Sequence, residues 1–247
     1  MNPLLHAIAF LTRIPVPYVS HSTKDWEKSV AYYPFVGLLI GVLLWGAGML
    51  LAYLFPLPVA AVLTMAFWVF ITGGLHVDGW MDLADGLGSN RPKEKVFEIM
   101  KDSRVGAMGV IAALLLFMVK GTTLYEAVSL HRMEWLIISP FIARFCLIMA
   151  IWFWPYITEK GIGTGLRNGL TAINVGVGFL FTGCIVYWIG RISGLAVFIM
   201  TIAGAVFFIR MIVKKLGGLT GDCYGAVVEW TEMAALVLLL LMKRWIG

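Results

Sequence analysis

Residues 29 to 77 read SVAYYPFVGLLIGVLLWGAGMLLAYLFPLPVAAVLTMAFWVFITGGLHV and contain no Asp, Glu, Lys or Arg. The hydrocarbon core of a bilayer is about 30 Å thick, and roughly 20 helical residues cross it. The stretch is therefore long enough for two membrane spans. The two prolines of Phe55-Pro56-Leu57-Pro58 predict the turn between these spans.

The composition of the whole chain agrees with a membrane protein. Of its 247 residues, 60% are hydrophobic and only 13% are charged, and the mean hydropathy is +0.89. So few charges cannot cover the surface of a soluble domain of this length, which excludes the soluble, disordered and coiled-coil classes. The net charge of +5 comes with no basic helix or basic-aromatic surface, so we expect no nucleic-acid partner.

Five further apolar windows complete the predicted membrane domain. They run from 105 to 119, 135 to 155, 168 to 190, 192 to 209 and 224 to 242, with a turn expected at Arg191. We expect about seven spans in a single domain, residues 1 to 247, since no internal repeat is visible. The N-terminal segment predicts an interfacial helix ended by Pro15 and Pro17. The predicted fold class is all-α: a polytopic integral membrane helix bundle.

The distribution of basic residues predicts the orientation of the bundle. Seven spans place the N-terminus and the loops near 78–104, 155–167 and 214–223 on one side, and the C-terminus on the other. Cytoplasmic loops carry an excess of Lys and Arg, so the first side is predicted to be cytoplasmic. It holds Arg13, Lys24, Lys28, Arg91, Lys93, Lys95, Lys101, Arg104, Lys160, Arg167, Lys214 and Lys215, against Lys120, Arg132, Arg191, Lys243 and Arg244 on the other side.

An acidic stripe follows the first long apolar stretch. In GGLHVDGWMDLADGLG, residues 73 to 88, Asp78, Asp82 and Asp85 occupy positions i, i+4 and i+7. In a helix these offsets place all three carboxylates on one face, where they repel each other. A divalent cation relieves that repulsion, and oxygen ligands favour Mg²⁺ or Mn²⁺ over zinc. The alternative is a solvated acidic helix end, which explains one Asp more easily than three in phase.

A second polar cluster lies in IMKDSRVGAMG, residues 99 to 109. Asp102 and Arg104 flank Ser103 just before the next predicted span. Asp102 has two interpretations, a helix cap or a substrate-binding residue. Arg104 is either an anchor at the membrane boundary or a planar fork that binds phosphate.

A third cluster lies in GGLTGDCYGAVVEWTE, residues 217 to 232. Glycines there let backbone amides approach an anion, and Asp222 opens the last span. Glu229 and Glu232 follow inside an apolar segment, where ionisable groups face a cavity or a partner. Arg144, within another span, is the expected opposite charge. Glu229 and Arg144 are candidate substrate-binding residues, and a structural buried pair among Arg144, Arg210 and Glu229 is the alternative.

These clusters together match the requirements of phosphoryl transfer. Mg²⁺ bridges diphosphate oxygens, arginines neutralise the remaining charge, and the protein positions the attacking oxygen in line. The pattern favours a substrate activated by a nucleoside diphosphate.

Four segments of the chain resemble the cobalamin synthase family, also called adenosylcobinamide-GDP ribazoletransferase. They are FLTRIPVP at 10 to 17, GGLHVDGWMDLADGLG at 73 to 88, EIMKDSRVGAMGV at 98 to 110 and GGLTGDCYGAVVE at 217 to 229. The four motifs occur in the family's order across nearly the whole chain. The match is looser between about 120 and 215.

The resemblance implies a Mg²⁺-dependent enzyme of the bacterial cytoplasmic (inner) membrane whose active site faces the cytoplasm. Its partners would be the lipid bilayer, adenosylcobinamide-GDP and α-ribazole or α-ribazole 5'-phosphate. The products would be adenosylcobalamin or its 5'-phosphate, and GMP. Asp82 and Asp85 are then the expected catalytic residues, and Asp78, Asp82, Asp85 and Asp222 the expected metal ligands. An oligomer is compatible with the sequence.

Two other functions are weighed against this one. A CDP-alcohol phosphotransferase also holds metal with carboxylates on a membrane helix, but its signature has an Ala-Arg pair after the first Asp-Gly. Here Asp78-Gly79 is followed by Trp80-Met81-Asp82. A cation-coupled transporter would place its ionisable groups near mid-bilayer in inverted repeats, whereas the acids here are densest at one rim.

Overall fold

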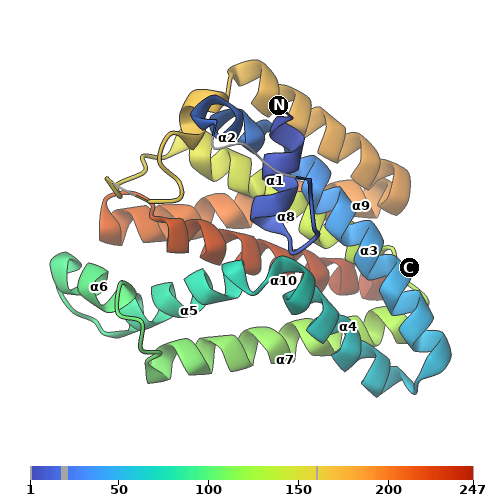
Figure 1. Ribbon diagram of the computed structural model, residues 1–247. Helices are drawn as coiled ribbons and strands as arrows, with labels where there is room; N and C mark the ends of the chain where they lie inside the picture. Colours follow the sequence, from blue (N-terminus) through green and yellow to red (C-terminus); the bar gives the residue numbers. More distant parts are fainter. Residues whose placement is uncertain (1, 18–21, 160, 247) are drawn as a thin grey trace.

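The computed structural model describes residues 2–17, 22–159 and 161–246 and is built from helices (Figure 1). Lys160, which was assigned to the cytoplasmic side, lies outside the described residues. The described part contains no β-strand beyond a single bridge between Tyr156 and Leu219. The elements are α1 (Pro3–Leu11), α2 (Thr23–Ser29), η1 (Val30–Tyr32), α3 (Tyr33–Leu54), α4 (Leu57–Thr72), α5 (Leu75–Gly88), α6 (Lys93–Met100), α7 (Ala107–Ser129), α8 (Trp135–Phe153), η2 (Leu166–Gly169), α9 (Ala172–Leu216) and α10 (Gly221–Ile246).

The structure confirms an all-α, polytopic membrane protein. Within the described ranges, five helices are long and apolar enough to cross a bilayer, or six when the bent pair α4 and α5 is counted as one span. Large apolar side chains such as Tyr53, Phe70 and Trp188 are exposed on the outside of the bundle, as expected for a surface in contact with lipid. The total of seven spans stays a prediction.

Helix α9 folds back on itself at the position where the sequence predicted a turn. Arg191 has a non-helical backbone, with φ 53° and ψ −145°. The rings of Phe179 and Phe198 lie 5.3 Å apart, although a straight helix would separate these residues by about 28 Å. The two predicted windows around Arg191 are therefore the two arms of a helical hairpin.

Helix α8 forms the centre of the bundle and is buried along almost its entire length. It packs against α3, α9 and α10. Glycines of α3 allow the closest approach: a Cβ atom on Gly37 would lie 2.6 Å from the carbonyl oxygen of Pro140, and one on Gly41 would lie 2.7 Å from Cα of Ile137. Small residues at such contacts are typical of helices that associate in lipid.

A sharp bend between α4 and α5 aims the acidic motif along the bundle. The two helices meet at 92° because Gly73 and Gly74 adopt the left-handed conformation, with φ of 65° and 69°. After the bend α5 packs between α7 and α10, and Figure 1 shows it running alongside α10.

The N-terminal helix is shorter than predicted. Its start is fixed by Asn2, whose side chain accepts from the amide of Leu4 at 3.1 Å. It ends at Leu11 rather than at Pro15, because the backbone of Thr12 is extended. The Thr12 hydroxyl donates a hydrogen bond to the carbonyl of Ile8 at 2.7 Å. The helix packs against α2 and α3, so it forms part of the bundle.

Candidate active site

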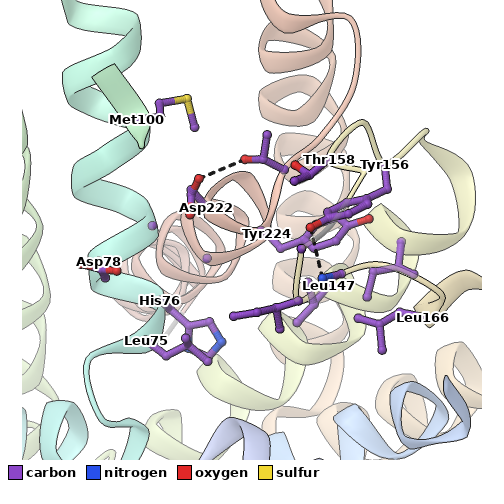
Figure 2. A pocket seen from close by; sticks show the side chains of 18 of the residues that line it. Leu75, His76, Asp78, Met100, Leu147, Tyr156, Thr158, Leu166, Asp222 and Tyr224 are labelled. Atoms are coloured by element: carbon purple, nitrogen blue, oxygen red, sulfur yellow. Dashed lines mark hydrogen bonds between the residues drawn. The ribbon is translucent and has the colours of Figure 1, made fainter. Parts of the chain in front are cut away.

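The acidic motif of α5 and the start of α10 meet in space. A Cβ atom on Gly79 would lie 2.7 Å from the carbonyl oxygen of Asp222, so only a glycine permits this approach of the two backbones. As a consequence, Asp78 and Asp222 line the same cavity of about 300 Å³ (Figure 2). Two of the expected metal ligands, which are far apart in the sequence, thus lie in one cavity.

The cavity is closed by segments from several parts of the chain. Besides α5 and α10 these are α1, α3, α6, α8 and the loop that follows α8. The loop is attached to the start of α10 through backbone bonds: Leu219 donates to Pro155 at 2.9 Å, and Ile157 donates to Leu219 at 3.0 Å. The lining residues are Phe10, Tyr33, Leu75, His76, Asp78, Gly79, Phe97, Met100, Lys101, Leu147, Ile151, Tyr156, Thr158, Gly161, Ile162, Gly163, Leu166, Thr220, Gly221, Asp222, Tyr224 and Gly225.

The carboxylates at this place have no basic partner in the parts of the chain that the structure describes. Half-buried Asp82 is close enough to Asp78, Asp85 and Asp222 to be repelled by all three. Asp222 accepts only a long hydrogen bond from Thr220 Oγ1, at 3.4 Å. Among the described residues, no Lys or Arg forms an ion pair with Asp78, Asp82 or Asp222. The site therefore carries uncompensated negative charge.

The donor set fits a magnesium ion that is completed by ligands from outside the protein. In the part of the chain that the structure describes, no three His, Cys, Asp or Glu side chains are already arranged around one metal position. Mg²⁺ does not need such a cage, because it retains waters and binds through one or two carboxylates together with substrate phosphates. Asp78, Asp82 and Asp222 are the residues that would hold it.

Asp85 has a contact that its spacing did not predict. Its two carboxylate oxygens accept from the backbone amides of Gly106 and Gly109, each at 2.7 Å. These amides belong to the N-terminal end of α7, which favours negative charge. A Cβ atom on Gly106 would lie 2.3 Å from Asp85 Oδ1, so the glycines make room for the carboxylate. Asp85 anchors α7 to α5, and its assignment as a metal ligand and catalytic residue stays a prediction.

Asp102 and Arg104 pair with each other on the surface. Asp102 accepts from the amide and Nε of Arg104, both at 3.0 Å, and from Nη2 at 2.7 Å. These hydrogen bonds lower the pKa of the Asp102 carboxyl to about 2. The prediction that Asp102 caps the next helix is wrong, because Gly106 occupies the cap position without any side-chain bond. Neither side chain lines the cavity, and that of Arg104 is 87% exposed.

A second charged cluster lies inside the bundle, and its charges are paired. Lys120 Nζ lies 2.9 Å from Glu229 and 2.7 Å from Glu232, and 4.0 Å from the centre of the Trp68 ring. Arg144 forms an ion pair with the other oxygen of Glu232. We call Lys120, Arg144, Glu229 and Glu232 the buried charge cluster.

The buried charge cluster corrects one expectation and confirms another. Lys120, assigned from the sequence to the non-cytoplasmic side, does not lie at a membrane surface, because it is 2% exposed and faces two glutamates. Arg144 is the opposite charge expected for the two glutamates, and it pairs with Glu232. The alternative ion pair of Glu229 with Arg144 or Arg210 is not formed among the described residues, and Arg210 is exposed. Glu229 and Arg144 do not line the cavity, and their role in substrate binding stays a prediction.

His76 connects the cluster with the cavity. Its Nδ1 lies 3.5 Å from Nη2 of Arg144, and its ring lines the cavity beside Asp78. Figure 2 shows the His76 ring projecting from α5 toward the centre of the site.

The sequence interpretation missed the aromatic lining of the cavity. Tyr156 and Tyr224 stack with ring centres 5.5 Å apart, and the amide of Gly163 donates to Tyr156 Oη at 3.2 Å (Figure 2). Lys101 also lines the cavity, although it was counted only as a topology signal. The sequence signal that could have pointed to this part of the cavity is the alternation of Gly161, Gly163 and Gly165 in the loop after α8, which is unusual for a simple connection.

Comparisons with known proteins assign the chain to a family. The family model described as cobalamin-5-phosphate synthase matches residues 3–240. A curated relative from Brevibacillus brevis, named adenosylcobinamide-GDP ribazoletransferase, is 47% identical over 99% of both chains. Relatives of the same name from Desulforamulus reducens and Desulfitobacterium hafniense are 39% and 36% identical over 96% of both chains. No solved structure matches the chain. The chain therefore belongs to the cobalamin-5-phosphate synthase family of membrane transferases.

Proposed function

We propose that the chain transfers adenosylcobinamide phosphate from adenosylcobinamide-GDP to α-ribazole or α-ribazole 5'-phosphate, with Mg²⁺ as cofactor. The name of its relatives supports the reaction class. The observation that carries the proposal is the cavity in which Asp78 of α5 and Asp222 of α10 lie together, with Asp82 close to both. An uncompensated acidic site of this kind suits a metal-bound diphosphate.

The reaction replaces the phosphoanhydride bond of the diphosphate with a phosphate ester bond to the ribazole. The 3'-hydroxyl oxygen of the ribazole attacks the phosphorus nearer the corrinoid, and the bond from that phosphorus to the bridging oxygen breaks. GMP leaves with the bridging oxygen, and the hydroxyl proton passes to a base. Mg²⁺, when bound, neutralises the diphosphate and the departing GMP.

The residues of the chain supply orientation and charge. Asp78, Asp82 and Asp222 would hold the ion, and Asp82, repelled by the neighbouring carboxylates, is also our candidate for the base that takes the proton. Lys101 lines the cavity and supplies positive charge to phosphate oxygens. Arg104 would join it only after leaving Asp102.

The cavity lies on the side predicted to be cytoplasmic. Its lining draws on all three loops assigned to that side: Lys101 comes from 78–104, Tyr156 from 155–167 and Thr220 from 214–223. This supports an active site that faces the cytoplasm from the inner membrane, where guanine nucleotides are available.

The test is a reconstitution with purified components. Protein in detergent is incubated with adenosylcobinamide-GDP, α-ribazole and Mg²⁺, and the products are separated by chromatography. We expect GMP and adenosylcobalamin in equal amounts, and neither product when EDTA is present. CDP-diacylglycerol in place of the corrinoid should release no CMP. Release of CMP, or no GMP with a folded protein, would refute the proposal, and GMP release without a sealed compartment rules out transport as the primary activity.

A further inference from the structure

A buried hydroxyl in the cavity wall has no hydrogen-bond partner. Tyr33 is 0% exposed and lines the cavity from the start of α3. Its Oη forms no hydrogen bond of normal geometry within the described part of the chain. Its polar neighbour is the hydroxyl of Ser29, which interacts with it only weakly and donates its own hydrogen to the carbonyl of Trp26 at 2.7 Å. Since a buried polar group without a partner is unfavourable, Tyr33 Oη is a place where a ligand atom would be stabilised.

The surroundings of this hydroxyl are apolar and aromatic. Phe10 packs beside Tyr33 with ring centres 6.2 Å apart, and Leu147, Ile151 and Leu166 are buried in the same wall. Figure 2 shows Leu147 and Leu166 on the side of the cavity away from Asp78. The cavity thus has an acidic side, where the diphosphate chemistry is proposed, and a mainly apolar and aromatic side, in whose wall the Tyr33 hydroxyl is buried.

We propose that the apolar side of the cavity binds the base of the ribazole, with Tyr33 Oη donating to the ring nitrogen that carries no sugar. This inference rests on the proposed function. The base of a ribazole is a flat, methylated benzimidazole, and apart from the sugar it offers a single hydrogen-bond acceptor. One buried donor in an aliphatic and aromatic wall complements that chemistry.

Guanine and the corrin ring match this wall poorly. Guanine presents several donors and acceptors on its edges, and the apolar side would leave most of them desolvated and unpaired. The corrin ring is several times larger than a cavity of about 300 Å³. The ribazole base therefore occupies the apolar side, its sugar hydroxyls point to the acidic side, and the corrinoid stays outside.

The first test measures binding without turnover. Equilibrium dialysis with α-ribazole alone compares the full-length wild type with Tyr33→Phe. Loss of one neutral hydrogen bond should weaken α-ribazole binding roughly three- to tenfold. Tyr32→Phe is the matched control, because Tyr32 is the neighbouring residue and does not line this cavity. It should bind as the wild type does.

The stability of Tyr33→Phe separates ligand binding from a structural role. Removing an unpartnered buried hydroxyl should leave the melting temperature unchanged or raise it. In turnover assays the KM for ribazole should rise while the KM for adenosylcobinamide-GDP stays the same. Unchanged α-ribazole affinity, a lowered melting temperature, or a higher KM for the GDP substrate instead would overturn the inference.

A second variant tests the wall itself. Ile151→Phe adds volume to the apolar side, so the riboside of dimethylbenzimidazole should lose at least about tenfold more affinity than that of unsubstituted benzimidazole. Phe153→Leu, on the same helix but exposed, should leave the ratio of the affinities for the two ribosides unchanged. Equal losses for both ribosides would contradict the assignment. If the wild type transfers the corrinoid but neither Tyr33→Phe nor Ile151→Phe alters ribazole binding, the proposed function stands and this inference fails. If instead both variants weaken ribazole binding but the wild type transfers no corrinoid, the proposed function fails and the binding site stands.

Discussion

The acidic site on α5 and α10 and the buried charge cluster contain the same kinds of side chain in opposite states. In the buried cluster two glutamates face a lysine and an arginine, and all four are removed from solvent. At the acidic site the carboxylates of Asp78, Asp82 and Asp222 face one another without a basic partner in any described segment. The first set neutralises itself, whereas the second carries negative charge that a bound cation would neutralise.

This difference separates a structural role from a functional one. A paired cluster inside a bundle fixes the positions of helices, because breaking one pair leaves a charge stranded in a low-dielectric interior. An unpaired acidic cluster beside a cavity opposes folding slightly, and we propose that it serves ligand binding. His76, which contacts Arg144 and lines the cavity, is the point where the two regions meet.

The largest effect is expected for Asp82→Asn. Loss of the central carboxylate should lower the transfer rate by about 10²- to 10⁴-fold, while the melting temperature should stay the same or rise because repulsion is relieved. GMP release and thermal unfolding in detergent measure the two quantities. Glu94→Gln, exposed on α6, is the control and should behave as the wild type. Near-normal GMP release by Asp82→Asn would show that the Asp82 carboxylate takes no part in the reaction.

The opposite pattern is expected in the buried charge cluster. Glu232→Gln leaves Lys120 and Arg144 with only Glu229 to balance them, and should destabilise the protein by about 3–5 kcal/mol. Thermal unfolding and the yield of folded protein in detergent report this change. A variant that remains as stable as the wild type yet loses activity would show that the cluster acts in catalysis.

A smaller effect is expected where α5 touches α10. Gly79→Ala places a Cβ atom about 2.7 Å from the carbonyl oxygen of Asp222, and the helices must separate at a cost of about 1–3 kcal/mol. The Mg²⁺ concentration required for half-maximal activity should rise, since the carboxylates move apart. Gly46→Ala is the control, because a Cβ atom there meets no neighbour within 4 Å. An unchanged Mg²⁺ requirement in Gly79→Ala would separate the helix contact from metal binding.

The smallest effect is expected for the exposed pair of Asp102 and Arg104. The pKa of Asp102 is lowered from an ordinary 3.8 to about 2 by its bonds to Arg104. Its stabilising contribution is therefore complete above about pH 3.8 and is lost as the pH falls through about 2. Because the pair is solvated, Asp102→Asn should leave the melting temperature at pH 7 nearly unchanged. A clearly lower melting temperature of Asp102→Asn at pH 7 would show that the pair has a structural role.

The sequence predicted the membrane class, the acidic motif and the turn at Arg191, because each of these is a local pattern. It did not predict which charges would meet. Lys120 precedes Glu229 by more than a hundred residues, and only the packing of α7 against α10 joins them. Asp85 shares the helical face of Asp82, yet its position opposite the start of α7 gives it two backbone partners. The free hydroxyl of Tyr33 likewise depends on its surroundings, and no spacing reveals it.

We propose that carboxylates of α5 and α10 bind one divalent cation together with a nucleotide diphosphate. Electron paramagnetic resonance of Mn²⁺, titrated into the purified protein with GDP, tests it most directly. We expect one tightly bound ion in the wild type and a loss of that ion in both Asp78→Asn and Asp222→Asn. Binding that is lost in Asp78→Asn but intact in Asp222→Asn would contradict it.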